Sequence, residues 1–395
     1  MDDTWSDALL DTLSLQGDPV ADAAVEAHAA ARPGLAGGAL VGSIAAHNSL
    51  PVEQRTPELS AFLDDLTPLP DWADPALMAR SAAFFDLYGL EIGLALFCAS
   101  LPEGYASPRG AKVLALTARL VTDPVRRIYE TAQFLMDTMT AGGLAVGTGA
   151  GYHDTRHVRL MHAAVRHLIR TDPAVVLSDD ERPEGEAWRR SWGVPLNQED
   201  LLGALMTFTV AVFESLDAMG AAYDPADAEA YLHTWCIVGH MLGIAPQHLP
   251  LTRSSAEQLT AAIRRRNWGP SADGLLLGQA LIDVLENTYR WPVLRGLPTA
   301  LISAYTGERV SAIVGARPGA IRVVFGPARR ILRRVALGEQ HDRFLRWVTR
   351  RVSVAVLGNF VAGDRSGDRG AFTLPAHLGD RVLRPATRFR FARRK

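Results

Sequence analysis

Apolar residues in this chain recur at three- and four-residue steps over most of its length, and this spacing constrains the fold more than any other feature. The stretch after Asp123-Pro124 is an example, because Asp suits the N-cap and Pro the first turn of a helix, and this one should end at Gly142-Gly143. The sequence has no regular series of β-branched runs with Asn-Gly or Asp-Gly turns, and no glycine-rich phosphate-binding turn. The pattern predicts an all-α protein.

The same periodicity predicts where the other helices lie. We expect them near residues 76–100, 153–170, 197–216, 227–242, 255–266, 274–290, 298–306, 328–337 and 341–357. The glycine-rich stretch 142–151 is then either a flexible connection between two helices or a lid near a site. The sequence shows no internal repeat, and no change in composition marks a linker between domains. We therefore expect one domain over residues 1–395, with a basic tail from about residue 381.

Charge is distributed unevenly along the chain. Residues 301–395 hold 20 Lys and Arg against 6 Asp and Glu, whereas the first 300 residues hold 21 against 37. A basic region can bind nucleic acid or an anionic membrane surface. The basic stretches lack the regularly placed aromatic residues that stack on bases, so we expect no nucleic-acid partner. The simpler interpretation is that the basic part packs against the acidic remainder or forms a solvated face.

The sequence also indicates the compartment. The longest apolar run, residues 89–101, contains Glu91 and is shorter than the roughly 20 residues that a membrane-spanning helix needs. The acidic N-terminus has neither a twin arginine nor a basic stretch before an apolar core. Two cysteines, Cys98 and Cys236, do not make a disulfide framework. We therefore predict a cytoplasmic protein without a transmembrane segment.

Four histidines, at positions 153, 157, 162 and 167, fall on one predicted helix. His153 and His157 have the i,i+4 spacing of two metal ligands, but no Glu follows His153, so the zinc-protease pattern is absent and two solvated histidines are the simpler interpretation. His162 lies on the apolar face, where a desolvated imidazole must be hydrogen-bonded or bound to a metal. Spacing alone favours a structural core histidine.

Arginines beside His162 change that balance. Arg159, Arg166 and Arg170 form a stripe next to it, and guanidinium groups pair with carboxylates in a bidentate fork. Arginines beside an apolar cavity suit a ligand with an apolar body and carboxylate edges. Haem has this shape, and its iron takes an axial imidazole. The sequence has no Cys-x-x-Cys-His, which excludes covalent c-type attachment.

A second group of polar residues lies on the preceding predicted helix. Arg127, Glu130 and Thr131 follow one another at i, i+3 and i+4, so one face presents a cation, a carboxylate and a hydroxyl. A surface ion pair worth a few tenths of a kcal/mol is one interpretation. The rest of this helix is strongly apolar, so the same face could equally line a cavity.

These segments, taken together, resemble a known family. Pro124-Val-Arg-Arg-Ile-Tyr-Glu-Thr and Val158-Arg-Leu-Met-His-Ala-Ala-Val-Arg-His carry the resemblance, with Trp192-Gly-Val-Pro-Leu-Asn-Gln-Glu-Asp and Trp235-Cys-Ile-Val-Gly-His further along. They are similar to the DUF2236 family, which includes latex-clearing protein (rubber oxygenase) and MpaB-type oxygenases. The resemblance covers about residues 65–250.

The resemblance implies a globin-like all-α core that encloses a b-type haem. The axial histidine of the family matches His162, in a setting formed by Arg159, Arg166 and His167. These four residues are the expected cofactor-binding residues, and His162 is the expected iron ligand.

On the distal side, the resemblance matches the family's arginine and threonine to Arg127 and Thr131. The latex-clearing branch carries a lysine just before that threonine, where this chain has Glu130. It also carries a glutamate base in a region where this chain has Lys112 and no acid. The distal chemistry is therefore not a copy, and Glu130 is our candidate for the base or proton shuttle.

These observations predict a haem b-dependent oxygenase that uses O2 on a small, apolar, unsaturated substrate. Oxidative cleavage of a carbon–carbon double bond is the reaction that the resemblance suggests. Two alternatives stay open at this point: a haem-binding sensor or carrier without turnover, and a metal-free helical protein that binds an apolar ligand.

Overall fold

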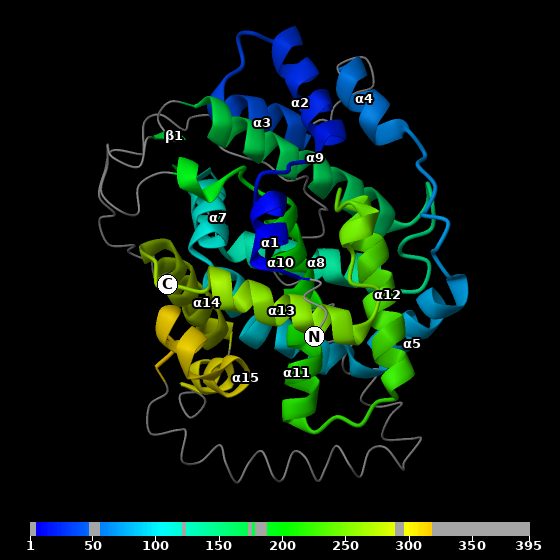
Figure 1. Cartoon of the computed structure of the whole chain (residues 1–395), viewed down its shortest axis with the longest axis vertical. Helices are drawn as coiled ribbons and strands as arrows, with labels where there is room; N and C mark the ends of the chain where they lie inside the picture. Colours follow the sequence, from blue (N-terminus) through cyan, green and yellow to red (C-terminus); the bar gives the residue numbers. More distant parts are fainter. Residues whose placement is uncertain are drawn as a thin grey trace, which may run out of the picture.

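Our computed structural model describes residues 5–46, 56–120, 124–172, 176–177, 188–288 and 296–317, with the backbone alone for 117–120, 124–129, 176–177, 190 and 287–288. Most of these residues are helical (Figure 1), which confirms the predicted all-α fold. The helices are α1 (Asp7–Ser14), α2 (Pro19–Ala31), α3 (Gly37–Ala46), α4 (Pro57–Asp64), α5 (Pro75–Ala95), α6 (Leu101–Tyr105), α7 (Pro108–Leu120), α8 (Pro124–Met139), α9 (Ala150–Thr171), α10 (Gln198–Phe208), α11 (Val210–Met219), α12 (Pro225–Met241), α13 (Arg253–Asn267), α14 (Ala272–Thr288) and α15 (Leu297–Ile313).

Short elements complete the described part of the chain. Strands β1 (Val176–Leu177) and β2 (Trp188–Arg189) pair in parallel, a π-helical turn (Leu96–Ser100) joins α5 to α6, and two 3₁₀ turns cover Arg190–Trp192 and Pro246–His248.

Most of the predicted helices are confirmed, and one is wrong. The helix expected over residues 197–216 is broken at Thr209, which separates α10 from α11. The Thr209 hydroxyl donates to the carbonyl of Leu205, and this kind of side-chain bond competes with the regular helical pattern. The predicted connection between α8 and α9 is confirmed, whereas helices α1 to α4, α6 and α7 were not predicted. The helices expected at 328–337 and 341–357, and the basic tail from 381, lie outside the described residues.

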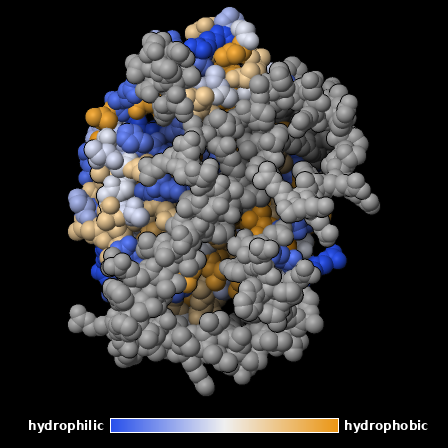
Figure 2. All heavy atoms as spheres, turned by 180° about the vertical axis from the view of Figure 1, so that it is seen from behind, coloured by the Kyte–Doolittle hydropathy of each residue, from blue (hydrophilic) through white to orange (hydrophobic). Residues whose placement is uncertain are grey.

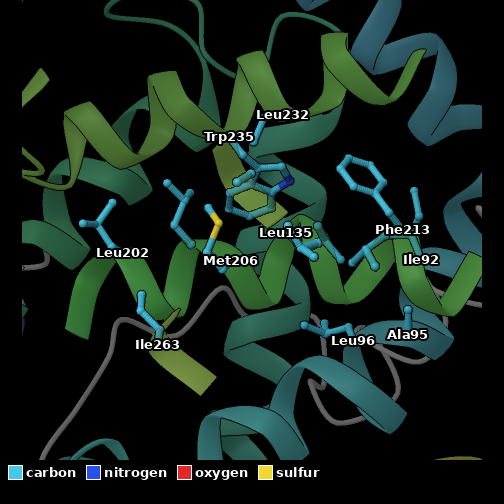
Figure 3. Packing of buried hydrophobic residues seen from close by; sticks show 14 of the residues in the cluster. Ile92, Ala95, Leu96, Leu135, Leu202, Met206, Phe213, Leu232, Trp235 and Ile263 are labelled. Carbon is cyan, nitrogen blue, oxygen red and sulfur yellow. The ribbon is translucent and has the colours of Figure 1, made fainter. Parts of the chain in front are cut away.

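The main hydrophobic core lies between α5, α8, α10, α11, α12 and α13 (Figure 3). At its centre, the indole of Trp235 on α12 stacks on Phe208 with ring centroids 4.6 Å apart. Phe213 of α11 and Tyr231 of α12 make an edge contact at 5.8 Å. Aromatic pairs of this geometry add to the free energy gained by burial alone.

A second core lies on the other side of α9. Helices α2, α3 and α4 cover that side as a separate layer (Figure 1), and Leu160, Ala164 and Leu168 of α9 face it. Val25 of α2 and Ile44 of α3 are fully buried in the same cluster. Helix α9 therefore has packed neighbours on both sides.

Two helical stretches, residues 75–105 and 198–219, are long and apolar enough to cross a membrane by length and composition alone. More than half of each apolar window is buried inside the protein, as is typical of core helices. Among the described residues visible on the rear face, blue polar and orange apolar residues are mixed near the top, and further orange residues are seen nearer the centre (Figure 2).

Candidate functional site

The two helices that carry the predicted site residues meet at a close glycine contact. A Cβ atom on Gly151, in the first turn of α9, would lie 2.5 Å from the carbonyl oxygen of Asp137 and 2.5 Å from Cα of Thr138, both in the last turns of α8. The amide of Tyr152 also donates to the carbonyl of Gly143 in the connection. Glycine at position 151 thus permits α9 to start directly against α8, and the two helices pack together.

His162 lies near the middle of α9, between an apolar edge and a stripe of arginines. Its side chain is half-buried, and its Nδ1 atom is shielded from solvent. Val165 and Ile169, at i+3 and i+7, pack against Val113 and Leu116 of α7. Two of the apolar residues that flank His162 at helical spacing are therefore buried against α7.

The other histidines of α9 have different surroundings. His153 is exposed, and its Nε2 atom lies 3.1 Å from the carbonyl oxygen of Gly147. His157 is half-buried and lies beyond the first turn, because α9 begins at Ala150, three residues earlier than predicted. Across the described ranges, no group of three or more His, Cys, Asp or Glu side chains is arranged to hold a metal ion.

Both arginines that flank His162 are ion-paired within the chain. Arg159 binds Asp18 through two bonds, with Nε 2.6 Å from Oδ2 and Nη2 2.8 Å from Oδ1. The Nε atom of Arg166 lies 2.8 Å from Oδ1 of Asp22. Both carboxylates belong to the start of α2, a helix that the sequence analysis missed, although Asp18-Pro19 repeats the Asp-Pro start signal of α8.

His167 faces a different direction from His162. Five residues along an α-helix correspond to a rotation of about 140°, so the two rings do not share a face. Burial lowers the pKa of His167, and the nearby carboxylates of Glu26 and Asp22 oppose that shift. Glu26 and Asp22 both belong to α2, so His167 lies beside that helix. The predicted role of His167 in cofactor binding stays a prediction.

Glu130 and Thr131 of α8 are both half-buried. Thr131 shares a face with Leu135, which is buried in the main core, and Glu130 shares a face with Phe134, whose ring lies 6.3 Å from that of Trp235. The side chain of Arg127 lies outside the described side chains. The structure thus places the described part of this group against the core, on a helix packed beside α9.

An acid that spacing alone did not reveal lies beside Lys112. Lys112 of α7 is 2% exposed and forms an ion pair with Asp273 of α14, which is also buried. The sequence analysis found no acid close to Lys112 along the chain. The acid is present in space, from a helix that begins 160 residues later in the chain.

Comparisons with known proteins agree with this architecture. The family model described as "ER-bound oxygenase mpaB/B'/Rubber oxygenase, catalytic domain" matches residues 88–361. The rubber oxygenase of Streptomyces sp. (strain K30) is 25% identical over 266 residues, which are 65% of this chain and 59% of that relative. The solved structure of the latex clearing protein LCP in the closed state has a TM-score of 0.70 at 22% identity, and the match covers 92% of this chain and 94% of that one. This similarity shows a shared fold, and the family match, which spans more than half of the chain, confirms the resemblance seen in the sequence. The chain belongs to the family of mpaB-type and rubber oxygenase catalytic domains.

Proposed function

We propose that this protein is a haem b-dependent oxygenase that uses O2 on a small, apolar, unsaturated substrate. The observation that carries the proposal is the position of His162, which lies inside the family match, on an apolar face of α9, next to the helix that carries Glu130 and Thr131. Oxidative cleavage of a carbon–carbon double bond is the reaction we assign to it.

The described residues fit a haem that is held by one axial histidine. Nδ1 of His162 is shielded from solvent while the side chain is only half-buried, so the remaining exposure lies elsewhere on the residue. We assign the iron to Nε2, because the second ring nitrogen of a metal-bound histidine usually faces the protein. Val165 and Ile169, three and seven residues after His162, lie on the same side of α9 and are apolar, and a porphyrin needs apolar surroundings.

Bound haem would supply the activation of O2, and the residues of α8 would control protons and charge. Glu130 is the only carboxylate in the proposed group of Arg127, Glu130 and Thr131, and we assign it the transfer of a proton. The hydroxyl of Thr131 can donate a hydrogen bond to a polar group of the reacting species, and Arg127 would provide a positive charge on the same helix.

The surroundings of this group favour an apolar substrate. Glu130 and Thr131 share their helix faces with Phe134 and Leu135, so a molecule beside them meets aromatic and aliphatic carbon. One relative is a rubber oxygenase, and rubber is an unsaturated hydrocarbon polymer. We infer that the chemical class is shared, and that this chain acts on small alkenes.

Haem content and oxygen uptake test the proposal. The full chain, produced with haem supplied, should be coloured, and a pyridine haemochrome spectrum should identify haem b at about one per chain. His162→Ala should lose the haem, whereas His153→Ala is the matched control and should retain it, because His153 is an exposed residue of the first turn. A His162→Ala protein with full haem content would disprove the assignment of the ligand.

Turnover separates an oxygenase from a carrier. O2 consumption with a series of small alkenes should rise above the rate without substrate, and the product should carry carbonyl groups at the cleaved bond. A haem protein that consumes no O2 with any alkene would instead support the sensor or carrier alternative.

A further inference from the structure

We infer that helix α2 holds the histidine-bearing turn of α9 in place through two carboxylates, so that Asp18 and Asp22 act as positioning residues for His162. This inference rests on the proposed function where it concerns haem, but its structural part stands on the contacts alone. The two ion pairs described above bracket His162, because Arg159 comes three residues before it and Arg166 four residues after it.

The first ion pair joins α9 to the start of α2. Asp18 is the N-cap of α2, and its Oδ1 atom accepts from the amide of Ala21 as well as from Arg159. The side chain of Asp18 is 3% exposed, so this bidentate pair is largely removed from water. A charge-assisted bond of this geometry fixes orientation as well as distance.

In the second ion pair, the arginine is buried more deeply than in the first. The Arg166 side chain is 1% exposed, and it donates from Nε to Asp22 and from Nη1 to the carbonyl of Leu196, at 2.7 Å. A buried guanidinium that loses its carboxylate is strongly destabilising, because its charge is then uncompensated. Asp22 therefore keeps Arg166, and with it this part of α9, in its observed place.

The backbone around the two pairs is shaped to admit them. A Cβ atom on Gly17 would lie 2.9 Å from Oδ2 of Asp22 and 3.2 Å from Nε of Arg166. Gly243 has a φ of +96°, and its Cβ would lie 2.3 Å from Oδ2 of Asp18. The side-chain amide of Gln198 donates from Nε2 to the carbonyl oxygens of both glycines, at 3.0 Å and 2.9 Å. Three separate parts of the chain thus converge on these two ion pairs.

Helix α2 is a firm support because it is also packed against α9. Ala21 and Val25 of α2 are fully buried in the same cluster as Leu160 and Ala164 of α9. The ion pairs add directional bonds to this apolar contact, one on each side of His162. A shift of α9 along its axis would break both pairs, so the axial position of His162 is determined by α2.

Removal of one carboxylate separates positioning from direct binding of the cofactor. If Arg166 binds a haem carboxylate, then Asp22→Asn frees the arginine and should maintain or strengthen haem binding. If Asp22 positions α9, the same change weakens haem binding. The two roles predict effects of opposite sign.

The experiment compares Asp18→Asn and Asp22→Asn with Asp227→Asn in the full chain. Asn is as good an N-cap as Asp, so Asp18→Asn removes the charge and retains the cap. Asp227 is the matched control, because its Oδ1 atom accepts from Nε of Arg80 at 2.6 Å and joins α12 to α5 rather than to α9. Hydrogen exchange of the amides in residues 155–169 is measured first, in the chain as purified.

We expect faster exchange across residues 155–169 in both α2 variants and no change in the control. Haem release to an apo-globin acceptor should become roughly 10-fold to 100-fold faster, the range by which loss of outer-shell partners weakens metal binding. The midpoint potential should move in the positive direction, because each variant leaves an arginine of α9 without its counter-charge, and added positive charge favours the reduced form of a bound haem.

A double variant, Asp22→Asn with Arg166→Met, is used if the single variant does not fold. The double variant should fold, because both charges of the pair are removed and no buried charge is left uncompensated. We expect haem release from it to stay fast. Release at the wild-type rate would overturn the inference, since Asp22 would then only neutralise Arg166. Unchanged exchange in the single variants would also overturn it, as would unchanged or slower haem release. Faster exchange in a chain that binds no haem would leave the role of α2 intact and refute the proposed function instead.

Discussion

The buried ion pair between Lys112 and Asp273 permits a quantitative prediction. The pair joins α7 to α14, and both side chains are almost fully excluded from solvent, at 2% and 6% exposure. Asp273→Asn retains the shape of the side chain and removes its charge. The ammonium group of Lys112 would then be buried without its carboxylate partner.

The expected loss of stability follows from the burial. Breaking a buried pair by removal of one partner costs about 3–5 kcal/mol, because the remaining charge is desolvated without compensation. With an unfolding entropy of about 2.1 cal/mol/K per residue, a chain of 395 residues has roughly 0.8 kcal/mol/K. The midpoint of thermal unfolding should therefore fall by about 4–6 °C.

Thermal unfolding followed by circular dichroism measures this shift. The double variant Lys112→Met with Asp273→Leu should recover most of the loss, because apolar residues of similar size often replace a buried pair without cost. Asp224→Asn is the control, since the pair of Asp224 with Arg80 is exposed and its loss should not be measurable. A midpoint for Asp273→Asn equal to that of wild type, or a double variant no more stable than the single one, would refute the reasoning.

Three further predictions concern α8, α6 and the contact between α8 and α9. Glu130→Gln should retain the haem content and lower alkene-dependent O2 uptake by about 100-fold or more, because this is the usual effect of losing a positioned acid or base. Full activity of the variant would show that Glu130 does not transfer the proton. Burial raises the pKa of Glu103 from 4.5 to about 7 despite its pairing with Arg264. Because the folded pKa is the higher one, this group favours the folded state at low pH, and that contribution is lost as the pH rises towards about 7. In urea unfolding between these pH values, Glu103→Gln should thus be less sensitive to pH than wild type, and parallel profiles would contradict this. Gly151→Ala should destabilise the protein by about 1–3 kcal/mol, since its Cβ would meet the backbone of α8. Gly104→Ala is the control, because its Cβ would meet nothing within 4 Å and should leave the stability unchanged. Equal unfolding midpoints for the two variants would disprove this prediction.

The parts of the fold that could be predicted are those where one helix face is strongly apolar. Helix α9 was found from the spacing of Val158, Met161 and Val165. Helix α2 was missed because alanine makes up much of it, and its buried positions, such as Ala21 and Val25, contrast little with the rest. The Asp18-Pro19 start was nevertheless readable in the sequence.

The sequence predicted those features of the candidate site that lie within one helix, but not the contacts between helices. His162 was singled out because its neighbours at three- and four-residue steps are apolar, and its half-buried position agrees with that reasoning. The partners of Arg159 and Arg166 could not be read in the same way, because Asp18 and Asp22 lie 141 and 144 residues earlier in the chain. Spacing reports which residues share a helix face, whereas such pairs depend on how helices pack.

The docking of the first helices onto much later ones has a consequence for the order of folding. The Asp18 and Asp22 contacts reach α9, and the indole of Trp5 donates to Ser255 at the start of α13, 250 residues further along the chain. A chain leaving the ribosome therefore exposes the apolar faces of α1 and α2 long before their partners have been made. Contacts of such long sequence separation form slowly, because a large loop must close before they contribute. The N-terminal helices should thus be among the last to acquire their native packing, and until then they are a natural target for chaperones.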